Sequence, residues 1–293
     1  MQLPAFTPPV LLAAGTAGTL DETAGVIDLA RLGGIVTKSI TAEPRAGNAP
    51  WRVAPVKAGM LNAVGLANPG LEAFLADHAP RIASMPTTVV GSVAGFSIEQ
   101  YTTVCHAFDA IEHMPAVELN VSCPNTGHGT EFGTDPVLLA ELVAACREQL
   151  ASTALIVKLP PVAIGTPHTI VDLARAAVDA GADALTLCNT VPAMAIDVDT
   201  GAPALGNRTG GLSGPAVHPI VTRLIDLCAR ELCAERGVPI LGLGGVTDWR
   251  DAAEFMLAGA EAVQVGTASF VSPKRVTRIA RQLERWRRRS RTD

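Results

Sequence analysis

Four polar side chains, Asn120, Ser122, Cys123 and Asn125, follow an apolar stretch that begins at residue 116. The apolar residues predict a buried strand that ends in two amides, a hydroxyl and a thiol. Such groups are costly to bury without hydrogen-bond partners. A thiol can also exchange protons where its surroundings favour the thiolate. The segment is therefore a candidate binding site for a polar small molecule, with Cys123 as the proton-transfer group, and an inert buried thiol is the alternative.

Other polar groups also fall where predicted strands end. The chain has only four lysines, and two of them, Lys38 and Lys158, occupy such positions, as do Asn189 and Thr190. A buried lysine must meet an anion or hydrogen-bond acceptors, or lose its proton. Because the carboxyl ends of parallel barrel strands share one face, we expect these side chains to lie close together.

Glycine-rich turns follow the last two predicted strands, at 242–245 and 265–267. Loops at these positions of a barrel commonly bind phosphate through backbone N–H groups, and glycine lets the backbone approach closely. A third stretch, 209–215, precedes a predicted helix and has the composition of an anion-binding nest. Tight turns without a binding role are the alternative for all three segments.

Eight strand–helix units are expected to position these groups. The predicted strands are 10–15, 34–40, 87–93, 116–122, 154–159, 184–189, 239–243 and 262–266. The predicted helices are 21–32, 68–84, 97–111, 135–150, 166–180, 218–236, 248–258 and 273–288. Near-continuous apolar strands are typical of parallel sheets covered on both faces. The sequence thus predicts an α/β fold, a (β/α)8 TIM barrel forming one domain over 1–293, with long loops at 41–68 and 190–215 on its C-terminal face; a doubly wound sheet is the alternative.

Composition narrows the function classes. The 293 residues are 48% hydrophobic and carry a net charge of -5, which gives no general argument for binding nucleic acid. The basic segment 285–291 is interpreted as a solvated tail, with a basic contact patch as the alternative. Six cysteines contain no Cys-x-x-Cys pair, which argues against an iron–sulfur or zinc site. No apolar run reaches the ~18 residues of a membrane span, and the first residues lack a basic start, so a cytoplasmic location is expected.

Three motifs resemble the class 1 dihydroorotate dehydrogenases. They are Glu118-Leu-Asn-Val-Ser-Cys-Pro-Asn125, Lys38-Ser-Ile-Thr-Ala-Glu-Pro-Arg-Ala-Gly-Asn48 and Met60-Leu-Asn-Ala-Val-Gly-Leu66. The resemblance runs in order from about residue 5 to residue 275, and the segment 185–215 is most similar to the NAD-linked, class 1B-like catalytic subunit. Enzymes of this family oxidise dihydroorotate to orotate with a bound FMN, in de novo pyrimidine biosynthesis.

The resemblance implies roles for individual residues. Cys123 would be the general base, which takes a proton from the carbon beside the one that gives hydride to the flavin, and Lys38 would contact both substrate and flavin. The implied substrate-binding residues are Lys38, Asn62, Val64, Gly65, Leu66, Asn120, Asn125, Asn189 and Thr190. The implied FMN-binding residues are Ala14, Gly15, Lys38, Ser39, Asn120, Lys158, Gly214, Gly244, Gly245, Gly266 and Thr267.

The resemblance to the NAD-linked branch also implies a partner subunit that carries FAD and an iron–sulfur cluster, in a homodimer or heterotetramer. After Asn125 the chain reads Thr-Gly-His-Gly-Thr-Glu-Phe-Gly, which departs from the family's usual Val-Lys-x-Gly-Gly and leaves substrate specificity open. The alternatives are a dihydropyrimidine dehydrogenase-like flavoenzyme, a non-redox barrel enzyme that binds a phosphorylated metabolite, and a non-catalytic flavin-binding subunit.

Overall fold

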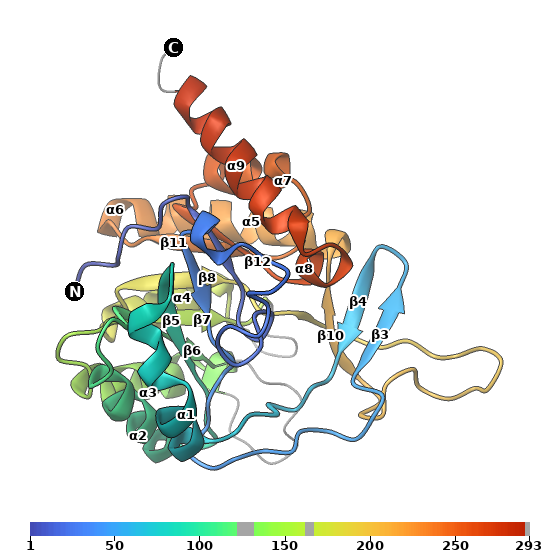
Figure 1. Cartoon of the computed structure of the whole chain (residues 1–293), viewed down its shortest axis with the longest axis horizontal. Helices are drawn as coiled ribbons and strands as arrows, with labels where there is room; N and C mark the ends of the chain where they lie inside the picture. Colours follow the sequence, from blue (N-terminus) through green and yellow to red (C-terminus); the bar gives the residue numbers. More distant parts are fainter. Residues whose placement is uncertain (122–131, 162–166, 291–293) are drawn as a thin grey trace.

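Eight parallel strands close into a barrel, in the order β1-β12-β11-β8-β7-β6-β5-β2 (Figure 1). The structure is a computed structural model of the chain, and it describes residues 1–121, 132–161 and 167–290. The barrel strands are β1 (Val10–Leu12), β2 (Gly34–Val36), β5 (Thr88–Val93), β6 (Ala116–Asn120), β7 (Ala154–Leu159), β8 (Ala184–Leu187), β11 (Ile240–Leu243) and β12 (Ala262–Val265). The predicted (β/α)8 barrel is confirmed, and the doubly wound alternative is wrong.

Helices cover the outside of the barrel (Figure 1). They are α1 (Leu71–Asp77), α2 (Ile98–Asp109), α3 (Pro136–Glu148), α4 (Ile170–Asp179), α5 (His218–Cys228), α6 (Ala234–Arg236), α7 (Trp249–Leu257), α8 (Thr267–Val271) and α9 (Lys274–Arg289). The helix predicted at 135–150 begins as expected: Asp135 accepts hydrogen bonds from the backbone N–H groups of Val137 and Leu138. Among the described residues, no helix is both long enough and apolar enough to cross a membrane.

The predicted helix at 21–32 is wrong. The structure has turns there, followed by one short 3-10 helix, η1 (Leu29–Arg31). The backbone N–H of Ala24 donates to the carbonyl of Asp21, three residues back, and the Glu22 carboxylate accepts from the N–H of Leu20. Gly25 and the β-branched residues around it have low helix propensity, so these local contacts prevail.

The two long segments predicted as loops contain a second, antiparallel sheet in the order β3-β4-β10-β9. Its strands are β3 (Val53–Val56), β4 (Gly59–Asn62), β9 (Val191–Ala193) and β10 (Gly210–Ser213). In this sheet Asn62 stands opposite Val53 on one side and Gly211 on the other. Figure 1 shows β3, β4 and β10 side by side, next to the barrel. The pairing of β4 with β10 fixes Asn62 relative to the later half of the chain.

Alternation along the strands divides the barrel interior into layers. The first layers are apolar: Phe6, Leu11, Val36, Val90, Ala116, Ala154, Ile156, Ala184, Leu241 and Ala262 form one buried cluster inside the barrel. Two residues further along three of these strands come Glu118, Thr186 and Gln264, which are all fully or almost fully buried. The core of the barrel therefore changes from apolar to polar toward the carboxyl ends of the strands.

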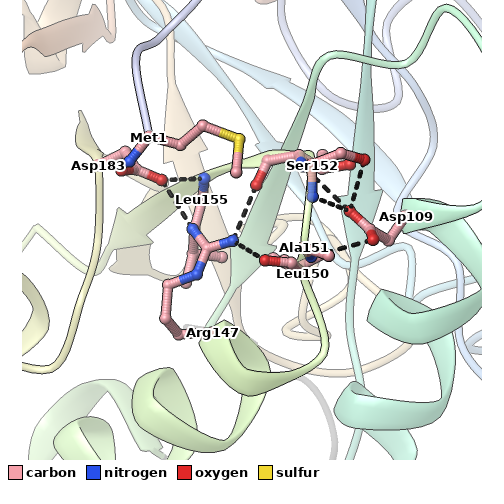
Figure 2. A network of polar contacts seen from close by, with 9 residues as sticks. Met1, Asp109, Arg147, Leu150, Ala151, Ser152, Leu155 and Asp183 are labelled. Carbon is pink, nitrogen blue, oxygen red and sulfur yellow. Dashed lines mark hydrogen bonds and ion pairs between the residues drawn. The ribbon is translucent and has the colours of Figure 1, made fainter.

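A polar network ties together the turns before β7 and β8 (Figure 2). Arg147 donates to the Asp183 carboxylate at 2.8 Å and to the carbonyls of Leu150 and Thr153. Asp183 also pairs with the amino group of Met1 and accepts from the N–H of Leu155. These bonds supply partners for backbone groups that leave regular structure where the strands begin.

The Asp109 carboxylate belongs to the same polar network and stabilises the turn before β7 (Figure 2). It accepts hydrogen bonds from the backbone N–H groups of Ala151, Ser152 and Thr153, each at 3.0 Å. Asp109→Asn replaces a charged acceptor by a neutral one with a single acceptor atom. We therefore expect a loss of about 1–2 kcal/mol in the free energy of unfolding at neutral pH, measured by urea denaturation.

The effect of this substitution should depend on pH. Partial burial raises the pKa of Asp109, but hydrogen bonds from Thr153, Ser152 and Ala151 outweigh it, so the net pKa is lowered. A carboxylate with a lowered folded-state pKa stabilises the fold above its unfolded pKa of about 3.9, and this stabilisation is lost as the pH falls through the folded pKa. The two proteins should thus converge in acid. Asp77→Asn, on an exposed site of α1, is the control, and an equal loss there would contradict the prediction.

Candidate active site

A cavity of about 240 Å³ lies at the carboxyl ends of the barrel strands and extends to the antiparallel sheet. Every barrel strand except β5 contributes residues at or just after its end. The rest of the wall comes from β3, β4 and β10, the segment 64–66, Val217 and Phe270. The described residues that line it are Ala13, Ala14, Gly15, Thr16, Lys38, Ser39, Val53, Met60, Asn62, Val64, Gly65, Leu66, Asn120, Lys158, Cys188, Asn189, Thr190, Leu212, Ser213, Val217, Leu243, Gly244, Gly245, Gly266, Thr267 and Phe270.

The structure brings most of the predicted site residues together in this cavity. All of those that it describes line the wall, except Gly214. Gly214 does not line the cavity, but its carbonyl oxygen is 2.8 Å from the position that a Cβ on Gly245 would take. Cys123 and Asn125, predicted as the base and a substrate ligand, lie outside the described residues, as does the altered loop that follows them.

Hydrogen bonds fix the orientation of two carboxamides in the wall. The backbone N–H of Thr190 donates to Asn189 Oδ1 at 2.8 Å, so the other end of that amide is the donor. Asn189 Nδ2 accordingly donates to Asn120 Oδ1 at 3.0 Å, and Asn120 Nδ2 donates to Ser39 Oγ at 3.2 Å. One backbone donor thereby determines which atom each amide presents.

The backbone beneath these amides is also held. The hydroxyl of Tyr101, a buried residue of α2, donates to the carbonyl of Asn120 at 2.8 Å. Ser39 Oγ is within 2.9 Å of Ser92 Oγ on β5, so β5 supports the wall although it does not line it. These contacts immobilise the polar groups before any ligand arrives, which reduces the entropy cost of binding.

Lys38 extends from the end of β2 across Gly15. The Lys38 Nζ is 3.3 Å from the position of a Cβ on Gly15, and Gly15 has φ +73°. Both facts favour glycine there, since a side chain would be strained and would press against the ammonium. The backbone N–H of Lys38 donates to the carbonyl of Thr19 at 3.1 Å. The amine of Lys38 is thus directed along the cavity wall.

The segment 64–66 is held on the opposite side by a buried amide. Asn68 Nδ2 donates to the carbonyl of Leu66 at 2.7 Å and to Thr41 Oγ1 at 2.9 Å. Its Oδ1 accepts from the backbone N–H groups of Thr41 and Gly70. All the hydrogen-bonding capacity of this side chain is used to shape the loop, so Asn68 positions Val64, Gly65 and Leu66 without lining the cavity itself.

Three glycines form another part of the wall. Gly244 and Gly245 have φ +149° and +72°, and a Cβ on Gly245 would be 2.8 Å from the carbonyl oxygen of Gly214. A Cβ on Gly266 would meet nothing closer than Ala13 Cβ at 3.7 Å. Beside them Thr267 Oγ1 donates to Ser213 Oγ at 2.7 Å. This part of the wall offers backbone and hydroxyl groups rather than bulky side chains.

Sequence reasoning missed several groups of the wall. Ser213 lies within the predicted glycine-rich nest, and its hydroxyl accepts a hydrogen bond from Thr267 Oγ1. Its position in that motif was the sequence feature that could have identified it. Burial raises the pKa of the Cys188 thiol to about 12, although nearby Lys158 lowers it in part. Cys188 is therefore a neutral thiol near neutral pH and is unsuited to be a base. Glu118, within the central motif, proves to be part of the polar layer directly below the cavity.

A closed eight-stranded parallel barrel, with a cavity of charged, amide and glycine groups at its C-terminal face, defines the chain as a (β/α)8 barrel enzyme. The family model described as dihydroorotate dehydrogenase matches residues 3–286. The chain belongs to the dihydroorotate dehydrogenase family, as its motifs indicated.

Its curated relatives cover nearly the whole chain. The "Dihydroorotate dehydrogenase B (NAD(+)), catalytic subunit" of Trichlorobacter lovleyi is 44% identical over 279 residues, 95% of this chain and 89% of that protein. The protein of the same name from Geobacter sulfurreducens is 44% identical over 279 residues, 95% and 88% of the two chains. A "Putative dihydroorotate dehydrogenase A (fumarate)" of Solibacter usitatus is 46% identical over 276 residues, 94% and 88%.

Proposed function

We propose that this chain oxidises dihydroorotate to orotate with a bound FMN, as the catalytic subunit of an NAD-linked dihydroorotate dehydrogenase. The observation that carries the proposal is the single cavity that gathers Lys38, Lys158 and three carboxamides with two glycine turns. Family membership supports the reaction, and the residues of the wall support the ligands.

The composition of the wall fits FMN. The glycines after β11 and β12 line the cavity without side chains, so a phosphate can approach the backbone N–H groups there closely. Lys158 lies on β7, which is separated from β11 in the barrel by β8. It offers a cation for the pyrimidine edge of a flavin, where negative charge builds on reduction. Apolar residues such as Ala14, Leu243 and Phe270 supply surface for an aromatic ring system.

The reaction separates into a proton and a hydride, which leave neighbouring ring carbons. Bound FMN supplies the acceptor for the hydride. Cys123 takes the proton, so its thiolate becomes a thiol while the ring gains its double bond. Asn62, Asn120 and Asn189 provide donors and acceptors for the edges of a planar pyrimidine, in orientations that are set before substrate binds. Lys38 places a positive charge beside both ligands.

A second subunit follows from the same proposal. The relatives named as catalytic subunits carry names that specify NAD, and the chain has no Cys-x-x-Cys pair for an iron–sulfur cluster. We therefore propose a partner that carries FAD and an iron–sulfur cluster, in a heterotetramer or around a homodimer of this chain. Robust reduction of fumarate by the isolated chain would favour instead the activity named for the relative from Solibacter usitatus.

Anaerobic mixing with dihydroorotate tests the reaction. The purified chain, loaded with FMN, should lose the visible flavin absorbance within a single turnover, and dihydrouracil should bleach it far more slowly. Faster bleaching by dihydrouracil would point to a dihydropyrimidine dehydrogenase-like enzyme. A protein that binds no FMN would favour a non-redox barrel enzyme, and bound FMN that neither substrate bleaches would favour a non-catalytic flavin-binding subunit.

Gly245→Ala should weaken FMN binding. Gly245 has φ +72°, and a Cβ added there would lie 2.8 Å from a backbone oxygen, so an alanine at this position would force the turn to move. We expect the dissociation constant for FMN to rise by about tenfold or more, measured by fluorescence titration, because each 1.4 kcal/mol of lost binding is a factor of ten.

Gly237→Ala is a matched control for this prediction. Gly237 has φ +64°, and a Cβ there meets nothing within 4 Å, so it carries similar backbone strain without a clash. It follows α6 and does not line the cavity. Equal losses of FMN affinity in the two variants would show that general destabilisation, and not the turn after β11, is responsible.

A further inference from the structure

A ring of polar side chains crosses the barrel interior beneath the cavity. Thr186 Oγ1 donates to Glu118 Oε2 at 2.8 Å, and Gln264 Nε2 donates to the same oxygen at 2.6 Å. Gln264 Nε2 also lies 3.2 Å from Thr186 Oγ1. These residues belong to β6, β8 and β12, which are not neighbours in the sheet, so their contacts run through the centre of the barrel.

The two oxygens of the Glu118 carboxylate have different surroundings. Oε2 receives two hydrogen bonds from the ring, whereas Oε1 lies 3.7 Å from Lys158 Nζ, outside hydrogen-bond distance but within reach of an ion pair. Thr186 and Gln264 therefore orient the carboxylate independently of Lys158. The carboxylate is completely inaccessible to solvent, so water does not screen its charge.

Lys158 stands between this carboxylate and the cavity. It lies opposite Asn120 in the pairing of β6 with β7, is 6% exposed, and lines the cavity wall. A cation so deeply buried is unfavourable without an anion close to it. Glu118 is the anion that the structure provides, and the positive end of the pair faces the cavity.

We propose that Glu118 is a positioning residue that holds the Lys158 ammonium in place at the cavity wall, and thereby raises the electron affinity of the cofactor in the cavity. The inference rests on the proposed binding of FMN. Negative charge that arrives on a flavin is stabilised by a fixed cation next to it, and a positioned ion pair supplies this field without rearrangement. Glu118 touches neither substrate nor cofactor and acts only through Lys158.

The test compares midpoint potentials of bound FMN in the full chain, measured by equilibration with a reference dye. In Glu118→Gln the ratio of reduced to oxidised FMN at a fixed potential should fall about tenfold, which is about 30 mV in the negative direction for a two-electron couple. Thr186→Val removes one of the two hydrogen bonds to Glu118 Oε2 but keeps both charges, so its potential should shift much less than that of Glu118→Gln. An unchanged or more positive potential in Glu118→Gln would overturn the inference.

Two further variants keep the test decisive if Glu118→Gln folds poorly. Glu118→Asp keeps the negative charge on a side chain that is one methylene shorter. Its potential should shift in the same direction as that of Glu118→Gln, but less. In a Lys158→Met background, which removes the buried cation, Glu118→Gln should cause no additional shift. An additional shift there would show that Glu118 does not act through Lys158. Failure of the wild type to bind FMN would instead reject the proposed function, and the inference with it.

Discussion

Replacing Cys123 by serine is expected to lower the rate at which dihydroorotate reduces the flavin by about 10²–10⁴ at neutral pH, the range that general base catalysis contributes. The reason is the acidity of the base. A free thiol titrates near pH 8.5, and a cation or hydrogen-bond donor beside a thiol lowers its pKa, whereas a hydroxyl ionises far less readily. The measurement is the anaerobic rate of flavin bleaching, which isolates the chemical step from any partner subunit.

The dependence on pH separates a lost base from a lost fold. The wild-type rate should rise through the thiol pKa and level off, whereas the serine variant should keep rising with pH. FMN affinity should change little, because the substitution leaves Lys158 and the glycine turns in place.

Cys105→Ala is the control for the thiol. Cys105 is a buried residue of α2, and a hydrogen bond with Cys146, together with burial, raises its pKa well above the usual range. It belongs to the packing between helices, so its loss should cost stability without changing the bleaching rate. A serine variant of Cys123 with the wild-type rate and pH profile would remove Cys123 from the mechanism.

The barrel was predictable because its strands bury both faces. Segments such as 154–159 are apolar except for Lys158 near the carboxyl end, and such a run is a local property that a sequence displays. The prediction of a helix at 21–32 was wrong because local interactions there outweigh the hydrophobic pattern. Its apolar residues have helical spacing, but Gly25 and hydrogen bonds such as that from Ala24 to Asp21 favour turns.

The antiparallel sheet was not predictable from local patterns. Its central pair joins Asn62 to Gly211, residues 149 positions apart, and the strands are short and rich in glycine. A Cβ on Gly211 would fall 1.8 Å from Thr190 Oγ1, so the glycine is required by a contact that only the folded chain creates. Glycine in such positions looks like a loop when the partner strand is unknown.

The candidate site divides in the same way. Lys38, Asn120 and Lys158 could be singled out because polar residues at the ends of apolar strands meet on one face of a barrel. The role of Glu118 could not be predicted in this way. A single acidic residue within a strand gives no indication of its partners, and only the folded barrel brings Thr186 of β8 and Gln264 of β12 into contact with it. Contacts across the barrel interior depend on the register of every strand between them.

Lys38→Met should lower kcat/KM for dihydroorotate by about 10²–10³, the cost typical of removing one charged or hydrogen-bonding group from a preorganised site. Methionine keeps the length of the side chain and its apolar contacts while it removes the positive charge. The amine of Lys38 passes over Gly15 into the cavity wall, so it lies beside both proposed ligands. Steady-state rates with an artificial electron acceptor measure the loss.

Lys57→Met is a matched control, because Lys57 is exposed between β3 and β4 and does not line the cavity. Gly15→Ala provides an independent approach to the same ammonium. Its Cβ would lie 3.3 Å from Lys38 Nζ at a backbone φ of +73°, so it should displace the amine and cause a smaller loss of kcat/KM than Lys38→Met. If Gly15→Ala lowered activity while Lys38→Met did not, the glycine would matter for the backbone alone, and the charge of Lys38 would have no part in the reaction.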